Sequence, residues 1–195
     1  MSPRTPEQNR AAREQTRHRI LEAALTLFDR VGYEQTSVKQ IAETAQIAQG
    51  LLYQHFAGKE QLLYAIFEEC SAQVRLSFAA GEGEEAEADQ RLAALIRRAF
   101  TLVRDGQDFW RLTYAVRLQP AVLAGLSPLL AESVTYIEAT LRRYFEGMND
   151  ANPELSARVL FALIDGTAQH FVLAPATYPL DDVADEIIRR FCPPE

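Results

Sequence analysis

Apolar side chains recur at three- and four-residue intervals along the chain, and no stretch alternates apolar and polar residues as a half-buried strand does. The first clear stripe comprises Ile20, Leu21, Ala24, Leu25, Phe28 and Val31. A second comprises Leu62, Leu63, Ile66, Phe67, Cys70 and Val74. This periodicity predicts an all-α protein of about nine helices.

Start and stop signals divide the N-terminal part into three helices. Gly32 follows the first stripe, where a helix that ends in a left-handed residue favours glycine. Ser37 opens a capping box and therefore begins a second helix, and a third, short helix is expected to end near Phe56. Residues 1–15 either extend the first helix back to Thr5 or form a mobile arm.

Prolines and glycines divide the remainder of the chain. Further helices are expected over residues 89–105, 108–119, 128–147, 153–174 and 181–191. In this interpretation Pro120 ends one helix, Ser127 and Pro128 begin the next, and Asp181 caps the last. The acidic stretch 81–85 is expected to be a solvated loop.

A long helix followed by two short helices, joined by about three residues, is the arrangement of a helix-turn-helix module, whose last helix enters the major groove of DNA. With Leu52 and Phe56 facing inward, Gly50 and Gln54 point most directly outward. Gln54 is then placed to pair with an adenine edge, and Gly50 allows a close approach to the duplex. Donors suited to phosphate oxygens flank this face, namely Tyr53, His55 and Lys59.

The identities in this segment fall in one register, which includes Ile20-Leu21, Ala23-Ala24, Leu27-Phe28, Gly32-Tyr33, Thr36-Ser37, Ile41-Ala42, Gly50, Leu52-Tyr53, His55-Phe56, Lys59-Glu60 and Leu62. Together they resemble the DNA-binding domain of the tetracycline-repressor (TetR) family of bacterial transcriptional regulators. The resemblance implies that Tyr53, His55 and Lys59 contact phosphates and that Gln49 and Gln54 face bases. The full set of expected DNA contacts is Thr16, Arg17, Ser37, Gln49, Gly50, Leu51, Tyr53, Gln54, His55 and Lys59.

Three positions of the reading element depart from the family pattern. Gln46 stands where a turn glycine is usual, Ala48 where Ser or Thr caps the recognition helix, and Leu51 where a hydroxyl is common. The missing cap corresponds to about 1 kcal/mol of stability. These departures keep an alternative function open, in which a homologue with weakened DNA reading acts as a ligand- or protein-binding module.

The resemblance continues more weakly in the C-terminal part, around Phe109-Trp110 and in the segment from Leu163 to Phe171. It implies that the last two helices pair with their copies in a second subunit as a four-helix bundle. Small residues such as Gly166 permit that close approach, and two-fold symmetry matches a palindromic operator. The expected dimer interface is Val159, Ala162, Leu163, Gly166, His170, Phe171, Val183 and Ile187.

Members of this family usually enclose a small-molecule pocket between these helices and the DNA-binding domain. The aromatic residues of the C-terminal part either line such a pocket or form the core, and polar residues near them orient a ligand. The candidates are Phe100, Phe109, Trp110, Tyr114, Arg117, Tyr136, Phe161, Asp165 and Gln169. The sequence does not identify the effector.

The formal net charge of −7 is unevenly distributed. Residues 1–60 carry eight basic and seven acidic side chains, so the remainder carries a net charge of −8. Such asymmetry is expected where one part of a protein approaches a polyanion. We therefore expect a DNA-binding domain over residues 1–62 and a helical ligand-binding and dimerisation domain over residues 63–195.

Composition and motifs also bear on location and chemistry. No apolar run suggests a membrane span or a signal peptide, and Cys70 and Cys192 have no metal-ligand spacing, which indicates a cytoplasmic protein without metal or cofactor. Asp165 and His170 do not share a helix face and have no catalytic companions, so no enzyme is expected. The leading interpretation is a homodimeric transcriptional regulator, a repressor that a small molecule releases from double-stranded DNA.

Overall fold

The computed structural model describes residues 5–79 and 87–192. Over these residues the protein forms helices and no strand, which confirms the all-α prediction. The helices are α1 (Pro6–Arg30), α2 (Val38–Thr44), α3 (Gln49–Tyr53), α4 (Lys59–Ala79), α5 (Ala88–Asp105), α6 (Gln107–Arg117), α7 (Pro120–Gly147), α8 (Pro153–Leu173) and α9 (Leu180–Phe191). The acidic stretch 81–85, expected to be a loop, lies outside the described residues.

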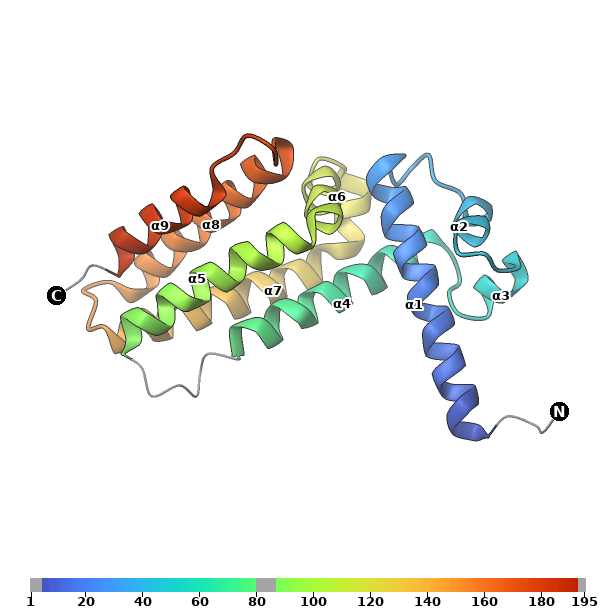
Figure 1. The fold of residues 1–195 in the computed structure, drawn as a ribbon, viewed down its shortest axis with the longest axis horizontal. Coiled ribbons are helices and arrows are strands. Elements are labelled where there is room, and N and C mark those ends of the chain that lie inside the picture. Colours follow the sequence, from blue (N-terminus) through green and yellow to red (C-terminus); the bar gives the residue numbers. More distant parts are fainter. Residues whose placement is uncertain (1–4, 80–86, 193–195) are drawn as a thin grey trace. The chain divides into compact units, whose positions relative to one another are not determined.

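The chain separates into two compact units, residues 1–68 (the first unit) and residues 69–195 (the second unit). The boundary falls inside α4, which starts next to the N-terminal helices and continues into the second unit (Figure 1). The division expected after residue 62 lies earlier in the same helix. Each unit has its own set of buried apolar side chains.

In the first unit, α1, α2 and α3 enclose a small apolar core. Ile20 and Phe28 of α1, Ile41 of α2 and Leu52 of α3 are buried almost completely. Ile20, Phe28 and Leu52 are among the side chains that the sequence predicts to face inward. Their burial holds the two short helices, which are too short to be stable alone, against α1.

Local signals in the sequence determine where α1 begins and ends. The Thr5 hydroxyl oxygen accepts the Gln8 N–H at 3.2 Å, and the Gln8 side chain accepts the Thr5 N–H at 3.0 Å. Pro6 takes the first helical position, so α1 has the earlier of the two starts that the sequence allows. Gly32 follows the helix with a φ of 96°, the left-handed conformation that its place after the apolar stripe predicts.

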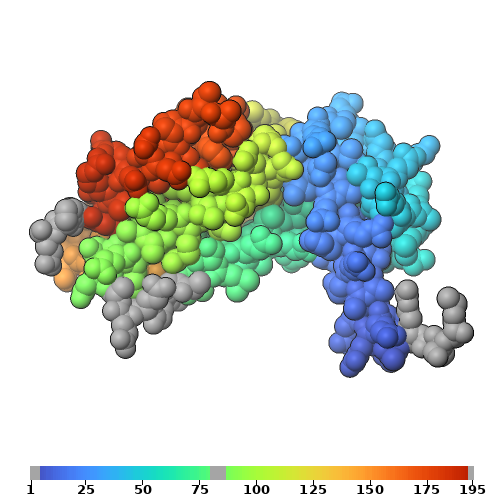
Figure 2. Space-filling view, viewed as in Figure 1, coloured from blue at the N-terminus to red at the C-terminus, as the bar shows by residue number. Residues whose placement is uncertain are grey.

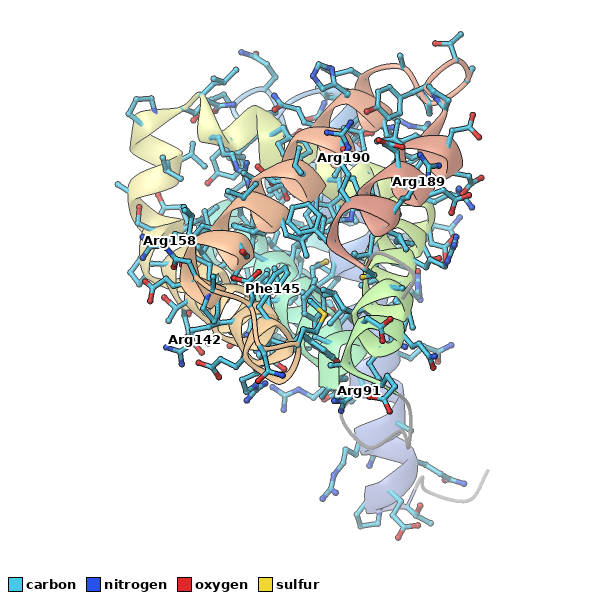
Figure 3. The ribbon with its side chains drawn as sticks, turned by 90° about the vertical axis from the view of Figure 1, so that its left-hand side faces the viewer. Arg91, Arg142, Phe145, Arg158, Arg189 and Arg190 are labelled. Atoms are coloured by element: carbon cyan, nitrogen blue, oxygen red, sulfur yellow. The ribbon has the colours of Figure 1, made fainter. Side chains whose placement is uncertain are left out.

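In the second unit, α8 packs against α5, α6, α7 and α9. Figure 3 looks at one end of this bundle and shows Phe145 in the interior, with Arg142, Arg158 and Arg189 at its margins. Phe145 of α7 is 1% exposed and lies edge-to-face with Phe191 of α9, at 5.9 Å between ring centroids. The core of this unit is therefore formed by helices that the sequence predicts to be amphipathic.

Four of the predicted helix limits are wrong. Pro120 begins α7 instead of ending a helix, because a proline without an N–H fits the first turn, and α7 then runs through Pro128. Pro128 and Ala124 are exposed, so the Ala124 carbonyl that loses its helical donor stays open to water. Asp181 lies in the first turn of α9, whereas the N-cap is Pro179. The third helix ends at Tyr53, and only a turn continues to Phe56.

By length and composition alone, α7 is apolar enough to cross a membrane, with a mean hydropathy of 1.3 over its most apolar window. Core helices of globular proteins meet the same criterion. Leu141 of α7 is buried in the core of the second unit, and α7 packs against α5, α6 and α8. We therefore interpret α7 as a helix of this bundle.

The two cysteines, Cys70 and Cys192, are half-buried free thiols. Burial raises the pKa of the Cys70 thiol to about 12 and that of Cys192 to about 11. Both thiols therefore stay protonated near neutral pH, which makes them poor nucleophiles and poor metal ligands. No cluster of metal-binding side chains occurs among the residues that the structure describes.

Candidate functional site

The turn between α2 and α3 gives the helix-turn-helix its shape. Ser37 caps α2, with its hydroxyl oxygen accepting the Gln40 N–H at 3.2 Å and the Gln40 side chain accepting the Ser37 N–H at 2.8 Å. The turn passes through Gln46, whose φ of 55° is left-handed. A non-glycine residue is strained in that conformation, which is the physical reason that glycine is usual there. Ala48 then begins α3 without any side-chain cap.

Arg19 of α1 supports this turn, a role that the sequence analysis missed. Its guanidinium donates to the carbonyl oxygens of Ala45 and Gln46, the latter at 3.3 Å. These carbonyls follow the end of α2, where a helix lacks internal donors for its last oxygens. A basic residue on the face of α1 next to the Ile20 stripe was the available signal.

The exposed face of α3 carries the side chains that were expected to read DNA. Gln49, Gly50, Tyr53 and Gln54 are exposed, whereas Leu52 on the opposite side is fully buried. A Cβ added at Gly50 would meet no atom within 4 Å, so the space in front of it is open. Gln54 is the C-cap that follows α3, and it is exposed.

Basic side chains of α1 lie near the residues that follow this face, His55 and Phe56. The Arg17 guanidinium lies 5.5 Å from the centroid of the Phe56 ring. The pKa of His55 is lowered, first by its burial and then by the positive charges of Arg13 and Arg17, with Glu14 opposing them. His55 is therefore a neutral donor near neutral pH, in a positive environment that favours a phosphate.

Two other predicted contacts already use their polar groups inside the protein. The Thr16 hydroxyl donates to the Ala12 carbonyl at 2.9 Å, and the Ser37 hydroxyl serves the cap of α2. Leu51 is half-buried. These residues thus lie beside the exposed face, with less freedom to turn toward a ligand than Gln49 or Tyr53.

Lys59 lies at the start of α4 and binds the loop that precedes α2. Its ammonium donates to the carbonyl oxygens of Tyr33 and Glu34, at 2.8 and 3.1 Å, and lies 4.6 Å from the centroid of the Tyr33 ring. An ammonium has three N–H donors, so one remains for a phosphate. Lys59 therefore has a structural role in addition to the phosphate contact that the resemblance implies.

A second candidate site is a small apolar cavity inside the second unit, with a volume of about 40 Å³ and partly open to solvent. This volume holds only a few water molecules, so a larger ligand can enter only when the surrounding side chains move apart. The cavity is lined by Val74, Phe78, Ala99, Leu102, Val103, Trp110, Tyr114, Ile137, Phe161, Ile164, Asp165 and Ala168.

Four of the predicted pocket residues, Trp110, Tyr114, Phe161 and Asp165, line this cavity. The other five, Phe100, Phe109, Arg117, Tyr136 and Gln169, are not among its lining residues. Phe100 is 3% exposed and belongs to the core, which is the alternative that the sequence left open for each aromatic residue. The aliphatic lining was missed because it has the same three- and four-residue spacing as any buried helix face.

The polar edge of the cavity is a cluster of Tyr114, Arg117 and Asp165. Arg117 of α6 donates to both carboxylate oxygens of Asp165 of α8, at 2.8 and 3.1 Å, and lies 4.9 Å from the centroid of the Tyr114 ring. The Tyr114 hydroxyl donates to the Asp165 carbonyl oxygen at 3.1 Å. Burial, followed by the negative charge of Asp165, raises the pKa of Tyr114 well above its usual value. Burial alone lowers the pKa of Arg117, but the hydrogen bond and charge of Asp165 raise it overall.

The predicted dimer residues of α8 form an apolar face that is open in the single chain. Val159 and Leu163 are 45% and 40% exposed, with Ala162, Gly166 and His170 on the same side. Figure 2 shows α9 and the end of α8, in red, at the surface of the second unit. Phe171 and Ile187 are instead buried in the core of their own unit, and Val183 is half-buried beside it.

A helix-turn-helix with an exposed reading helix, joined to a separate helical unit with an internal cavity, defines a ligand-binding class of DNA-binding proteins. Residues 20–66 match the bacterial regulatory proteins of the tetR family, and residues 88–193 match the C-terminal domain of BetI-type transcriptional repressors. The chain belongs to the tetR family and is a DNA-binding transcriptional regulator, which confirms the family and the regulatory role that its sequence predicts.

Individual relatives are similar to this chain over most of its length. The fatty acid metabolism regulator protein of Bacillus subtilis (strain 168) is 23% identical over 174 residues, which are 87% of this chain and 90% of that protein. The fatty acid degradation regulator FadR from Bacillus halodurans has the same fold, with a TM-score of 0.79 at 18% identity over 98% of this chain and 97% of that one. The transcriptional regulator FadR from Bacillus subtilis, crystallised with stearoyl-CoA, has a TM-score of 0.76 at 22% identity over 90% and 97%.

Proposed function

We propose that the protein is a homodimeric repressor that binds a palindromic operator through α3 and leaves it when a small molecule enters the second unit. The observation that carries the DNA-binding part is the exposed face of Gln49, Gly50, Tyr53 and Gln54 above a buried Leu52. In this proposal Gln49 and Gln54 contact base edges, and Tyr53 contacts phosphate. The net charge of the chain is −7, so the basic residues of α1 are needed to direct the acidic protein to DNA.

The proposed effector is an amphiphile with a long apolar chain, such as a long-chain acyl-CoA. The cavity supports this proposal because all but one of its lining residues lack a charge, so that only an apolar group enters without loss of hydration. The regulator crystallised with stearoyl-CoA has the same fold over 90% of this chain. A ligand that favours one arrangement of the dimer lowers the affinity for the operator by its difference in affinity between the two states.

The proposed dimer forms through the exposed face of α8, which comprises Leu155, Val159, Ala162, Leu163, Gly166 and His170. Apolar side chains that are 40–56% exposed along one helix face mark an interaction surface. Two-fold symmetry about this face would place two copies of α3 on two half-sites of DNA. We place this regulator in the cytoplasm and without catalytic activity.

The test is a DNA-binding titration with the purified full chain and the DNA upstream of its own gene. Fluorescence anisotropy at several salt concentrations should give tight binding to that DNA and at least 1,000-fold weaker binding to a random duplex. Stearoyl-CoA should then release the operator, whereas free coenzyme A should not.

Two outcomes contradict the proposal in different ways. Equal binding to operator and random DNA would favour the alternative of a homologue with weakened DNA reading, consistent with the strained Gln46 and uncapped Ala48. Specific operator binding that no acyl-CoA releases would support the DNA-binding part of the proposal and would exclude acyl-CoA as the effector.

A further inference from the structure

Among the described residues that line the cavity of the second unit, Asp165 is the only one with a charged side chain. The remaining lining consists of aliphatic residues, alanines and the aromatic rings of Phe78, Trp110, Tyr114 and Phe161. The carboxylate of Asp165 does not face the cavity unpaired, because Arg117 binds both of its oxygens. An apolar chain that enters and widens the cavity therefore meets no unpaired charge inside, and any charged part of a ligand must lie at the edge beside Arg117.

Arg117 is well suited to receive an anion at that edge. Its side chain is 39% exposed, so a group from solvent can reach it. Two of its five N–H donors are used on Asp165, and its planar fork matches carboxylate and phosphate oxygens. Asp165 holds this fork in a bidentate pair, which is the arrangement that an incoming carboxylate would adopt.

We infer that Arg117 is the receptor for the anionic head of the effector and that Asp165 occupies this position while the cavity is empty. This inference rests on the proposed function and adds the chemistry of the ligand: a single apolar chain with a carboxylate or phosphate head. An entering head group takes over N–H donors of Arg117 and displaces the Asp165 carboxylate. The carboxylate then pairs with water at the edge of the cavity, where its side chain is 27% exposed.

This exchange also couples the cavity to the proposed dimer helix. Arg117 and Tyr114 lie on α6, and Asp165 lies on α8 one residue before Gly166 of the proposed dimer face. The ion pair and the Tyr114 hydrogen bond join these two helices. Displacement of the carboxylate removes the ion pair, so α8 loses one of its links to α6 when the effector binds.

The only tryptophan of the chain, Trp110, lines the cavity and reports directly on its occupancy. Its fluorescence can be titrated with four probes of equal chain length: dodecanoate, dodecanoyl-CoA, dodecanol and dodecyltrimethylammonium. We expect dodecanoate to bind about tenfold more tightly than dodecanol, because a hydrogen-bonded charge contributes at least that factor. Dodecanoyl-CoA distinguishes a phosphate-bearing head from a free carboxylate, and dodecyltrimethylammonium should bind most weakly.

Two variants test the roles of the ion pair. Arg117→Gln should reduce the preference for dodecanoate over dodecanol to about one, without changing the affinity for dodecanol. Asp165→Asn removes the competitor and should tighten dodecanoate by about threefold, as expected for a partly exposed pair. Arg104→Gln is the matched control, since Arg104 forms an ion pair between α5 and α9 with Asp181 and does not line the cavity. It should leave all four affinities unchanged.

Two results would overturn the inference. The first is tightest binding of dodecyltrimethylammonium that Asp165→Asn abolishes, which would make Asp165 a receptor for cations. The second is an unchanged preference for dodecanoate in Arg117→Gln. In both cases the operator titration with stearoyl-CoA decides separately whether the proposed function stands. Circular dichroism of each variant shows whether the helices are intact.

Discussion

The two units of this protein keep their functional groups in opposite places. In the first unit, Gln49, Tyr53 and Gln54 are exposed on a helix of only five residues, which depends on its neighbours for support. In the second unit, Trp110 and Asp165 turn inward and line a cavity. DNA is recognised by an exposed helix face that must be rigid, whereas a ligand is bound inside a cavity whose lining must be able to move apart.

Charged side chains serve both designs in different ways. Arg19 and Lys59 of the first unit donate to backbone carbonyls, and so hold the turn and the loop around the reading element. Arg117 of the second unit instead binds a side-chain carboxylate that another anion can replace. The difference predicts that damage to the first unit alters DNA binding alone, whereas the second unit controls both ligand response and dimer formation.

The largest expected effect is that of a substitution in the second unit on DNA binding by the first. Gly166→Arg should give a monomer and weaken operator binding by at least about 100-fold, because two linked reading helices gain avidity that one lacks. A Cβ added at Gly166 meets no atom within 4 Å in its own subunit, so we expect the substitution to harm contact with a partner rather than the fold. Light scattering and anisotropy measure both effects.

Gly125→Arg is the matched control for this variant. Gly125 is an exposed glycine of α7, where an added Cβ also has open space. It should remain dimeric and bind the operator normally. A dimeric Gly166→Arg variant with normal DNA binding would show that the exposed α8 face is not the interface.

The next effect isolates the reading function of the first unit. Gln54→Ala should relax the base preference at one pair in each half-site by about 1–3 kcal/mol, the contribution of a bidentate glutamine–adenine contact. Binding to random DNA and release by stearoyl-CoA should be unchanged. Selection from randomised operators measures the preference, with Gln73→Ala, an exposed position on α4, as the control. An unaltered profile would move the reading role to Gln49 and Tyr53.

Lys59→Ala tests support and phosphate binding together. Loss of two hydrogen bonds from the half-buried ammonium should lower the free energy of unfolding by about 1–2 kcal/mol, measured in urea. Lys39→Ala removes an equal charge from an exposed side chain that is 3.9 Å from Glu43, and should change stability by less than about 0.5 kcal/mol. If the third donor of Lys59 binds phosphate, the slope of log K against log salt falls by about one. An unchanged slope would leave Lys59 with its loop-holding role alone.

The first unit was more predictable from sequence than the second, for a physical reason. Its helix limits depend on local signals such as the Ser37 capping box and the left-handed Gly32, and the buried side of α3 follows from the four-residue spacing of Leu52 and Phe56. The exposed direction of α3 follows from the same periodicity. The position of Arg19 beside the Ile20 stripe was visible in the sequence, but its hydrogen-bond partners were not predictable, because they lie 26 and 27 residues away.

In the second unit, apolar spacing located helices but could not distinguish a core from a cavity. Phe100 and Phe161 have the same character in the sequence, yet only Phe161 lines the empty space. Pro120 and Pro128 were interpreted as helix limits, although tertiary packing carries α7 through the second of them. The ion pair of Arg117 and Asp165 joins two helices 48 residues apart, which no local pattern encodes.

The smallest expected effect concerns the stability of α3, without a change in its recognition of bases. Ala48 has φ and ψ of −67° and 140°, the extended conformation of an N-cap, but its side chain has no acceptor. In Ala48→Ser the hydroxyl oxygen can accept the N–H of Gly50 or Leu51, which should raise the free energy of unfolding by about 0.5–1 kcal/mol. The gain stays below the full value of a cap because the Leu51 N–H already donates to the Ala48 carbonyl at 2.9 Å. Ala11→Ser, within the exposed part of α1, should instead lower stability by about 0.5 kcal/mol, because serine is a weaker helix former than alanine. Urea unfolding compares the two variants, and the base preference of Ala48→Ser should equal that of the wild type. A changed preference would mean that the first turn of α3 takes part in reading DNA as well as in holding the helix.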